Sequence, residues 1–111
     1  KRGMSLQRFV DITSANAAKI MGLYPQKGVL APGSDADIVL IDPNFKRPLV
    51  MNDFHISDYS IWEGFPVEGW PVMTILRGTV AVEDGELKTR LGTGKFITRK
   101  LNPEITNKPG C

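Results

Sequence analysis

The chain has 111 residues, of which 41% are hydrophobic, so it can bury one core and no more. Fourteen basic residues against twelve acidic ones leave a formal net charge of +2, which is too small and too evenly spread to favour nucleic acid or an anionic membrane as a partner. The single cysteine is the last residue, Cys111, so no internal disulfide can form and nothing indicates an oxidising compartment.

The sequence also lacks the features of targeting segments. No apolar run approaches the roughly 20 residues that cross a bilayer. The charged start, residues 1–10, has no long apolar stretch behind it, unlike a signal peptide. We therefore expect a cytoplasmic protein, and because the chain begins with Lys1 rather than Met we expect it to be part of a longer product.

Residues 5–21 have a helical pattern. Ser5 is a suitable N-cap, and a second start at Thr13 or Ser14 precedes an alanine-rich body that stops at Gly22. This pattern predicts two short helices that meet at Thr13. The apolar residues of the first helix recur at spacings of three and four and form one face: Leu6, Phe9, Val10 and Ile12.

The pattern changes after Gly22. Residues 23–35 contain two prolines and two glycines, which predicts a connector with turns. Residues 36–42, ADIVLID, predict a strand that is buried on both faces or nearly so and that Pro43 terminates. Residues 44–66 are expected to be irregular, with one short strand near Leu49 to Met51.

Further β segments follow. The sequence predicts strands in residues 69–78 and 79–89, separated at Gly78. Asp84 and Gly85 form a good hairpin turn within the second of these segments. GKFIT, residues 94–98, is a candidate for a last short strand, and the tail is expected to have little fixed structure unless something holds it.

Two acids stand where the turn meets the first predicted strand. Asp35 and Asp37 are two apart, so on a strand both carboxylates point to the same side and could share a divalent cation. No His, Cys or suitably spaced Glu nearby would complete the ligand set. We therefore expect Ser34 and Asp35 to shape the turn, and Asp37 to lie at the start of the strand and accept hydrogen bonds from backbone amides.

Residues 91–96, LGTGKF, contain the Gly-Lys pair of a phosphate-binding loop. The full motif needs a glycine five residues before its second glycine, and Ser or Thr after the lysine. Those positions are Thr89 and Phe96 here. A loop that leads into a strand is therefore the better interpretation.

His55 is the only histidine of the chain. A catalytic histidine needs a nucleophile or an orienting partner, and Asp53, Ser57 and Asp58 are close in sequence. Members of a catalytic triad usually meet from distant parts of a chain, so we interpret His55 as a structural loop histidine. One histidine and Cys111 are also too few to supply three or four zinc ligands.

Residues 59–70 hold four of the nine aromatic residues of the chain, together with two glutamates. Aromatic rings beside carboxylates can bind sugars or cationic ligands. The same mixture closes a small core or a contact between subunits, which is the interpretation that we favour. The members of this aromatic stretch are Tyr59, Trp62, Glu63, Phe65, Glu68 and Trp70.

Taken in order, these motifs resemble the closing segment of the cyclic amidohydrolases, especially the dihydropyrimidinase and hydantoinase group. The resemblance covers nearly all of residues 3–100 and is most specific in residues 22–43, where a GLYP-KG connector and a PGSDAD turn lead into a strand. SDYSIWEG, GWPVMTILRG and GKFITRK are similar to later markers of the same tail. Two departures concern the subfamily: Ala17 stands where many relatives have proline, and Trp62 where Phe or Tyr is common.

The resemblance implies a mixed α/β fragment. Residues 1–22 would be the closing helices of a (β/α)₈ barrel, residues 23–100 the C-terminal part of a small β-sandwich domain, and residues 101–111 a tail. In this family the sandwich also takes strands from the N-terminal segment of the enzyme. The implied partners are therefore the remainder of the amidohydrolase chain and sister subunits.

The resemblance also implies a function. Enzymes of this family hold two divalent metals, commonly zinc, in the barrel through an HxH pair, a carbamylated lysine, two further histidines and an aspartate, and a metal-bound hydroxide attacks the ring amide. This chain has no HxH, and the resemblance assigns no catalytic, cofactor-binding or metal-binding residue within it. It would be the structural C-terminal part of a hydrolase of hydantoins, dihydropyrimidines or similar cyclic amides. The alternative is a free-standing β-rich binding or assembly module that uses the aromatic stretch as an interface.

Overall fold

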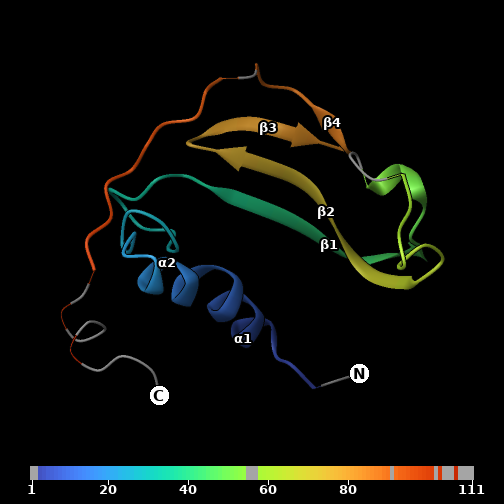
Figure 1. Ribbon diagram of the computed structural model, residues 1–111, viewed down its shortest axis with the longest axis horizontal. Helices are drawn as coiled ribbons and strands as arrows, with labels where there is room; N and C mark the ends of the chain where they lie inside the picture. The colour runs from blue at the N-terminus through green and yellow to red at the C-terminus, as the bar shows by residue number, and fades with distance from the viewer. Residues whose placement is uncertain (1–2, 55–57, 91, 102, 104–106, 108–111) are drawn as a thin grey trace. The chain divides into compact units, whose positions relative to one another are not determined.

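The computed structural model describes residues 3–54, 58–90, 92–101, 103 and 107. The chain divides into two compact units: residues 1–37 together with 90–111, and residues 38–89. The first unit contains the helices and the second contains an antiparallel sheet (Figure 1). Within the described residues, no helix is long and apolar enough to cross a membrane. The assignment of residues 1–22, 23–100 and 101–111 to barrel, sandwich and tail stays a prediction.

The helical region is one run of three segments: α1, Leu6–Val10; a π-helical turn, Asp11–Ala15; and α2, Asn16–Ile20. The N-cap prediction is confirmed, because the hydroxyl of Ser5 accepts a 3.1 Å hydrogen bond from the backbone N–H of Arg8. The predicted new cap at Thr13 or Ser14 is wrong. The Thr13 hydroxyl donates to the Phe9 carbonyl one turn back, at 2.8 Å, and the backbone stays helical through the junction.

Helix α2 ends where the sequence predicts. Gly22 has φ +71°, its N–H donates to the Lys19 carbonyl at 3.1 Å, and the N–H of Leu23 donates to the Ala18 carbonyl at 2.8 Å. This is a Schellman motif, which satisfies carbonyls at the helix end and favours glycine in the left-handed position. Ala18, within α2, is 7% exposed and is one of two buried apolar side chains among the described residues, with Ala81.

The sheet of the second unit has four antiparallel strands in the order β1-β2-β3-β4. Their bounds are Ile38–Pro48 for β1, Pro66–Leu76 for β2, Thr79–Glu83 for β3 and Glu86–Leu87 for β4. The predicted hairpin turn is confirmed, since Asp84 and Gly85 connect β3 to β4 with φ of +50° and +80°. Arg77 and Gly78, with φ of +47° and +78°, make the same kind of connection between β2 and β3, at the predicted break.

Strand β1 differs from the prediction in length. Pro43 does not terminate it, because the pairing with β2 skips residues 43–45 and resumes at Lys46, opposite Glu68. The carboxylate of Asp42 accepts a 2.9 Å hydrogen bond from the N–H of Asn44 within this irregularity. A proline is tolerated there because β1 is an outer strand of the described sheet.

Three further expectations about the strands are wrong. No strand forms at residues 49–51, since Met51–Asp53 is a 3₁₀ turn whose Asp53 carboxylate accepts from the N–H of Val50 at 2.9 Å. Residues 94–98 are not a strand either. Strand β1 is not buried on both faces in this chain by itself, because Val39, Leu40 and Ile41 are 54%, 45% and 46% exposed.

Candidate functional site

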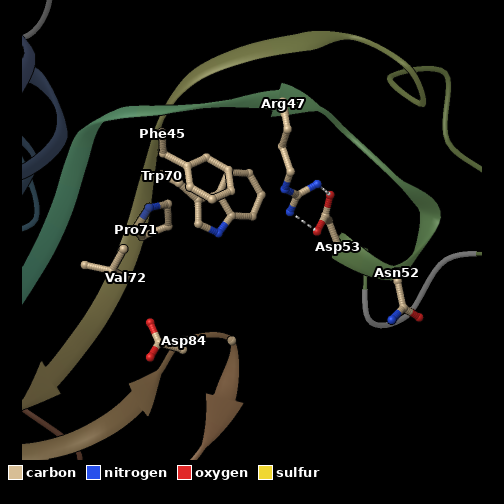
Figure 2. A pocket seen from close by; sticks show the side chains of 9 residues that line it. Phe45, Arg47, Asn52, Asp53, Trp70, Pro71, Val72 and Asp84 are labelled. Atoms are coloured by element: carbon tan, nitrogen blue, oxygen red, sulfur yellow. Dashed lines mark hydrogen bonds and ion pairs between the residues drawn. The ribbon is translucent and has the colours of Figure 1, made fainter.

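The sheet unit contains a pocket of about 430 Å³. Figure 2 shows that strands β1 and β2 supply its aromatic wall and that the segment after β1 supplies Asn52 and Asp53. The turn between β3 and β4 contributes Asp84 and Gly85. The lining residues are Phe45, Arg47, Asn52, Asp53, Trp70, Pro71, Val72, Asp84 and Gly85.

An ion pair between Arg47 and Asp53 occupies one side of this pocket. The guanidinium makes two hydrogen bonds to the carboxylate, of 2.6 Å from Nη1 and 2.5 Å from Nη2 (Figure 2). Hydrogen bonding to Asp53 raises the pKa of Arg47. Desolvation of the guanidinium opposes this effect in part, and the negative charge of Asp53 adds to it. Because Asp53 also accepts from the N–H of Val50, this bidentate pair fixes the 3₁₀ turn to strand β1.

Two aromatic rings complete the arrangement. Trp70 on β2 stacks on Phe45 of β1 with 5.7 Å between ring centroids and 27° between the planes. The guanidinium carbon of Arg47 lies 4.7 Å from the centroid of Trp70 and 5.4 Å from that of Phe45. The faces of both rings therefore stabilise the positive charge of Arg47, which also pairs with Asp53. Phe45 lies in the irregular part of the β1–β2 pairing, and its contact with Trp70 connects the two strands there.

The chemistry available in the pocket is limited. Of the described residues that line it, none is a Ser, Cys, His or Lys that could act as a nucleophile, and the Arg47 guanidinium is already paired with Asp53. Asn52 and Asp84 offer exposed polar groups. The arrangement is an ion pair packed against two aromatic rings.

The two acids considered as a metal site lie in the helical unit, and they meet a cation. Nζ of Lys27 is 2.8 Å from Oδ2 of Asp35 and also pairs with Oδ2 of Asp37. All three side chains are at most 31% exposed. Burial by itself would lower the pKa of Lys27, but hydrogen bonds to both carboxylates and their charges outweigh it, so the pKa is raised.

The sequence analysis missed Lys27. It lies eight residues before Asp35, in a connector without periodicity, so no local pattern links the two. The turn around these residues is further held by a 2.7 Å hydrogen bond from the Ser34 hydroxyl to the Pro25 carbonyl, and by a 3.3 Å hydrogen bond from the Gln26 amide to Asp35. The acids thus share an ammonium group of the chain and hold the turn closed.

The aromatic stretch is divided in the structure. Trp62 and Phe65 make an edge-to-face pair with centroids 5.6 Å apart, and both are about half exposed. Tyr59 is more exposed still, whereas Trp70 belongs to the pocket. Glu68 pairs with Lys46 at 3.4 Å on the surface. The four rings therefore do not form one ligand-binding cluster.

The remaining candidates lie wholly or partly outside the described residues. His55 and Ser57 are among the residues that the structure does not describe, and so is Leu91, the first residue of LGTGKF. The described part of that motif continues without a helix through residue 101, unlike a phosphate-binding loop. Over the described parts of the chain, no group of three or more His, Cys, Asp or Glu side chains could hold a metal ion.

Comparison with known proteins gives consistent matches. The model of the amidohydrolase family matches residues 1–81. A D-phenylhydantoinase of Escherichia coli is 47% identical over 98 residues, which are 87% of this chain and 21% of that protein. The chain thus spans about a fifth of the length of the curated relatives that it matches.

Solved structures agree with the sequence matches. A D-hydantoinase from a Bacillus species is similar with a TM-score of 0.83 and 43% identity over 88% of this chain and 22% of that one. A dihydropyrimidinase from Brevibacillus agri gives 0.82 and 41%, over 86% of this chain and 21% of that one. An L-hydantoinase from Arthrobacter aurescens gives 0.81 and 42%, over 86% and 22%.

Proposed function

The chain belongs to the amidohydrolase family, and on that premise we propose that it is the C-terminal part of a metal-dependent hydrolase that opens cyclic amides. The substrate class is hydantoins, dihydropyrimidines or closely similar rings. One observation carries the proposal: the similarity to hydantoinases extends over nearly the whole chain in sequence and in backbone structure. The enzyme would act in the cytoplasm.

Within that enzyme the segment is structural. Residues 1–22 are proposed to close the barrel, residues 23–100 to belong to a β-sandwich domain, and residues 101–111 to form a tail. A helical run that stops at Gly22 and an antiparallel sheet after it support this division. The exposed apolar residues of β1 support the idea that other strands, from the rest of the enzyme chain, and sister subunits cover the sheet.

The geometry of the pocket supports the same role. Arg47 and Asp53 satisfy each other, and Trp70 and Phe45 stack beside them, so these groups join strand β1 to the turn that follows it. The guanidinium also donates a 3.1 Å hydrogen bond to the Pro48 carbonyl, so three of its five N–H groups already serve contacts within the chain. The pocket is therefore proposed to stiffen the sheet.

The described residues do not offer a binding site for the divalent metal ions that the enzyme would need. Zinc or another divalent ion would activate water for attack on the ring amide, but such a site needs several ligands close together, and the described residues offer no such group. Lys27 already neutralises the acid pair that came nearest to a site. We propose that the metal ligands belong to a part of the enzyme outside this chain, and no catalytic step is assigned to any residue in it.

Expression of the enzyme from a coding sequence that extends upstream of Lys1 tests this function. The purified protein should open hydantoin or dihydrouracil, lose that activity on dialysis against a chelator, and regain it with zinc or manganese. An upstream sequence without an HxH motif, or a metal-loaded protein inactive on both rings, would contradict the proposal.

A further inference from the structure

The end of helix α2 is in direct contact with the C-terminal segment of the helical unit. The N–H of Lys100 donates a 2.7 Å hydrogen bond to the carbonyl of Gly22. Residues 22 and 100 are far apart in sequence but belong to the same compact unit. This hydrogen bond joins two segments of the unit that are separated in sequence by residues 23–99.

From this contact we propose that residues 92–101 act as a strap that is latched to the end of α2 at Gly22. The latch is a conformational device of the chain: closed, it fixes the C-terminal segment to the helical unit; open, it releases that segment. The inference rests on the geometry at Gly22 and does not depend on the reaction of the enzyme.

Gly22 is required at this position for two separate reasons. Its φ of +71° is a conformation that residues with a side chain rarely adopt. In addition, a Cβ atom on Gly22 would lie 2.7 Å from the carbonyl oxygen of Lys100, 2.9 Å from its carbonyl carbon and 3.1 Å from the nitrogen of Leu101. These are backbone atoms, so no side-chain rotation could relieve the overlap and the strap itself would have to move.

The latch is not the only attachment of the strap, because Thr93 also takes part in an interaction, but much of the strap is exposed. Of residues 92–101, Phe96 is 93% exposed, whereas Ile97 is partly buried and Leu101 is 40% exposed. Partial burial of two apolar side chains contributes modestly to holding the strap, and the backbone hydrogen bond at Gly22 adds a directional contact. A segment attached in this way opens at a low free-energy cost, and its opening responds to a change at a single residue.

Opening the latch removes one hydrogen bond just beyond the end of helix α2 and leaves the helix itself intact. The Gly22 carbonyl is one of the acceptors just beyond the end of α2, and in the closed state the Lys100 N–H satisfies it. The Schellman bonds of Gly22 and Leu23 run to Lys19 and Ala18 within the helix, so they survive when the strap leaves. The strap can therefore detach without unwinding α2, which makes the device reversible.

The test compares Gly22→Ala with Gly33→Ala in the full 111-residue chain. Gly33 has φ +89° and nothing within 4 Å of a built Cβ, so its substitution reproduces the backbone strain without the overlap. Amide hydrogen exchange at Lys100, and trypsin cleavage after Lys95, Arg99 and Lys100, report on the strap. Gly22→Ala should accelerate both by about tenfold or more, and Gly33→Ala by no more than about twofold. Equal acceleration by the two variants would overturn the proposal.

A second variant keeps the test decisive if Gly22→Ala fails to fold. Lys100→Pro removes the N–H that closes the latch and leaves the helix untouched. Cleavage after Lys95, which all variants share, should accelerate to a similar degree as in Gly22→Ala, with an unchanged circular dichroism spectrum. In a double variant the effects of Gly22→Ala and Lys100→Pro should not add, because both break the same contact. Unchanged cleavage in Lys100→Pro would mean that no latch exists at Gly22.

Discussion

Asp53 accepts two hydrogen bonds from the Arg47 guanidinium and one from the N–H of Val50, so its replacement affects three hydrogen bonds. Asp53→Asn keeps the shape of the side chain but removes the charge. We expect a lower midpoint of urea unfolding, because the guanidinium loses its partner beside Trp70 and the 3₁₀ turn loses its anchor.

Glu68→Gln is the matched control for this change. It removes the carboxylate of an ion pair with Lys46 that is 3.4 Å long and exposed on both sides, and such pairs contribute little. Urea titration of both variants at the same protein concentration gives the comparison. A midpoint shift for Glu68→Gln as large as that for Asp53→Asn would show that the bidentate Arg47–Asp53 pair contributes no more to stability than the exposed Lys46–Glu68 pair.

Lys27 predicts a dependence of stability on alkaline pH. Its folded-state pKa is raised above the ordinary value of 10.5, so the stabilisation is fully present below pH 10.5 and is lost as the pH rises through the folded-state pKa. We therefore expect the free energy of unfolding to fall above about pH 10.5 in the wild type. Lys27→Met should be less stable at neutral pH, where two carboxylates face each other unneutralised, and should lack the part of the alkaline decline that Lys27 causes.

The control for the pH experiment is Lys19→Met. Lys19 lies 5.3 Å from the ring centroid of Tyr24 and forms no ion pair among the interactions described, so its removal should leave the alkaline decline in place. Unfolding midpoints from pH 7 to pH 11 for the three proteins decide the matter. An alkaline decline of equal size in Lys27→Met and the wild type would show that another group is responsible.

These residues also show where sequence reasoning stops. The sequence places Asp35 and Asp37 at the start of a strand and shows no His, Cys or suitably spaced Glu nearby in sequence, which favours a structural role for them. The ammonium group that neutralises them comes from Lys27, in a connector whose path is set by turns and not by a period. A pairing of this kind depends on the fold of the turn, which the sequence pattern does not encode at that distance.

Among the elements, the β3–β4 turn is the one whose sequence signal is strongest, and it allows a quantitative prediction. Gly85 has φ +80° and an open space where a Cβ would lie, so Gly85→Ala adds backbone strain without a clash. We expect a loss of about 1 kcal/mol in the free energy of unfolding.

Gly94→Ala is a suitable control for Gly85→Ala. Gly94 also has open space at its Cβ position but does not have a positive φ that would strain a side-chain-bearing residue. Denaturant unfolding of both variants should show a loss for Gly85→Ala alone. An equal loss in the two would mean that the conformation of the turn is not what matters.

The other elements show which parts of a fold are local. The Asp-Gly turn, the Ser5 cap and the Gly22 stop are decided by residues next to each other, and all three were predictable. The continuation of β1 past Pro43 depends on its irregular pairing with β2, whereas residues 94–98 pair with none of the described strands. Pairing between distant segments decides both, so the local pattern gave the wrong answer.

For the molecule as a whole, the exposed apolar residues predict self-association. Val39, Leu40 and Ile41 on the outer strand β1 are about half exposed, and Leu6 and Val10 on α1 are also exposed. An outer strand with uncovered apolar residues invites pairing with another chain. The isolated chain should therefore dimerise or aggregate at low micromolar concentration, as measured by light scattering.

The variant Val39→Lys with Ile41→Lys tests the cause. The two positions are two apart on β1, so they share one face, and charges there should suppress association. Substitution of Glu63 by Lys, on an exposed loop, controls for added positive charge. A wild-type chain that stays a monomer of 12.3 kDa, unfolds cooperatively and binds no dye for apolar surfaces would favour the free-standing module instead.

The last prediction concerns activity: the isolated chain should not open hydantoin or dihydrouracil, even with zinc or manganese added. The sequence has one histidine and one cysteine, too few for a site with two metals, and Lys27 is paired with both Asp35 and Asp37. Mixing or co-expressing the chain with the remainder of the enzyme should restore turnover. The remainder would then cover the apolar strand β1 of this chain, and the chain would support the barrel that holds the metals. Turnover by the chain alone that exceeds a metal-only blank and survives repurification would refute the structural role, whereas full activity of the remainder without the chain would show that the enzyme does not need it.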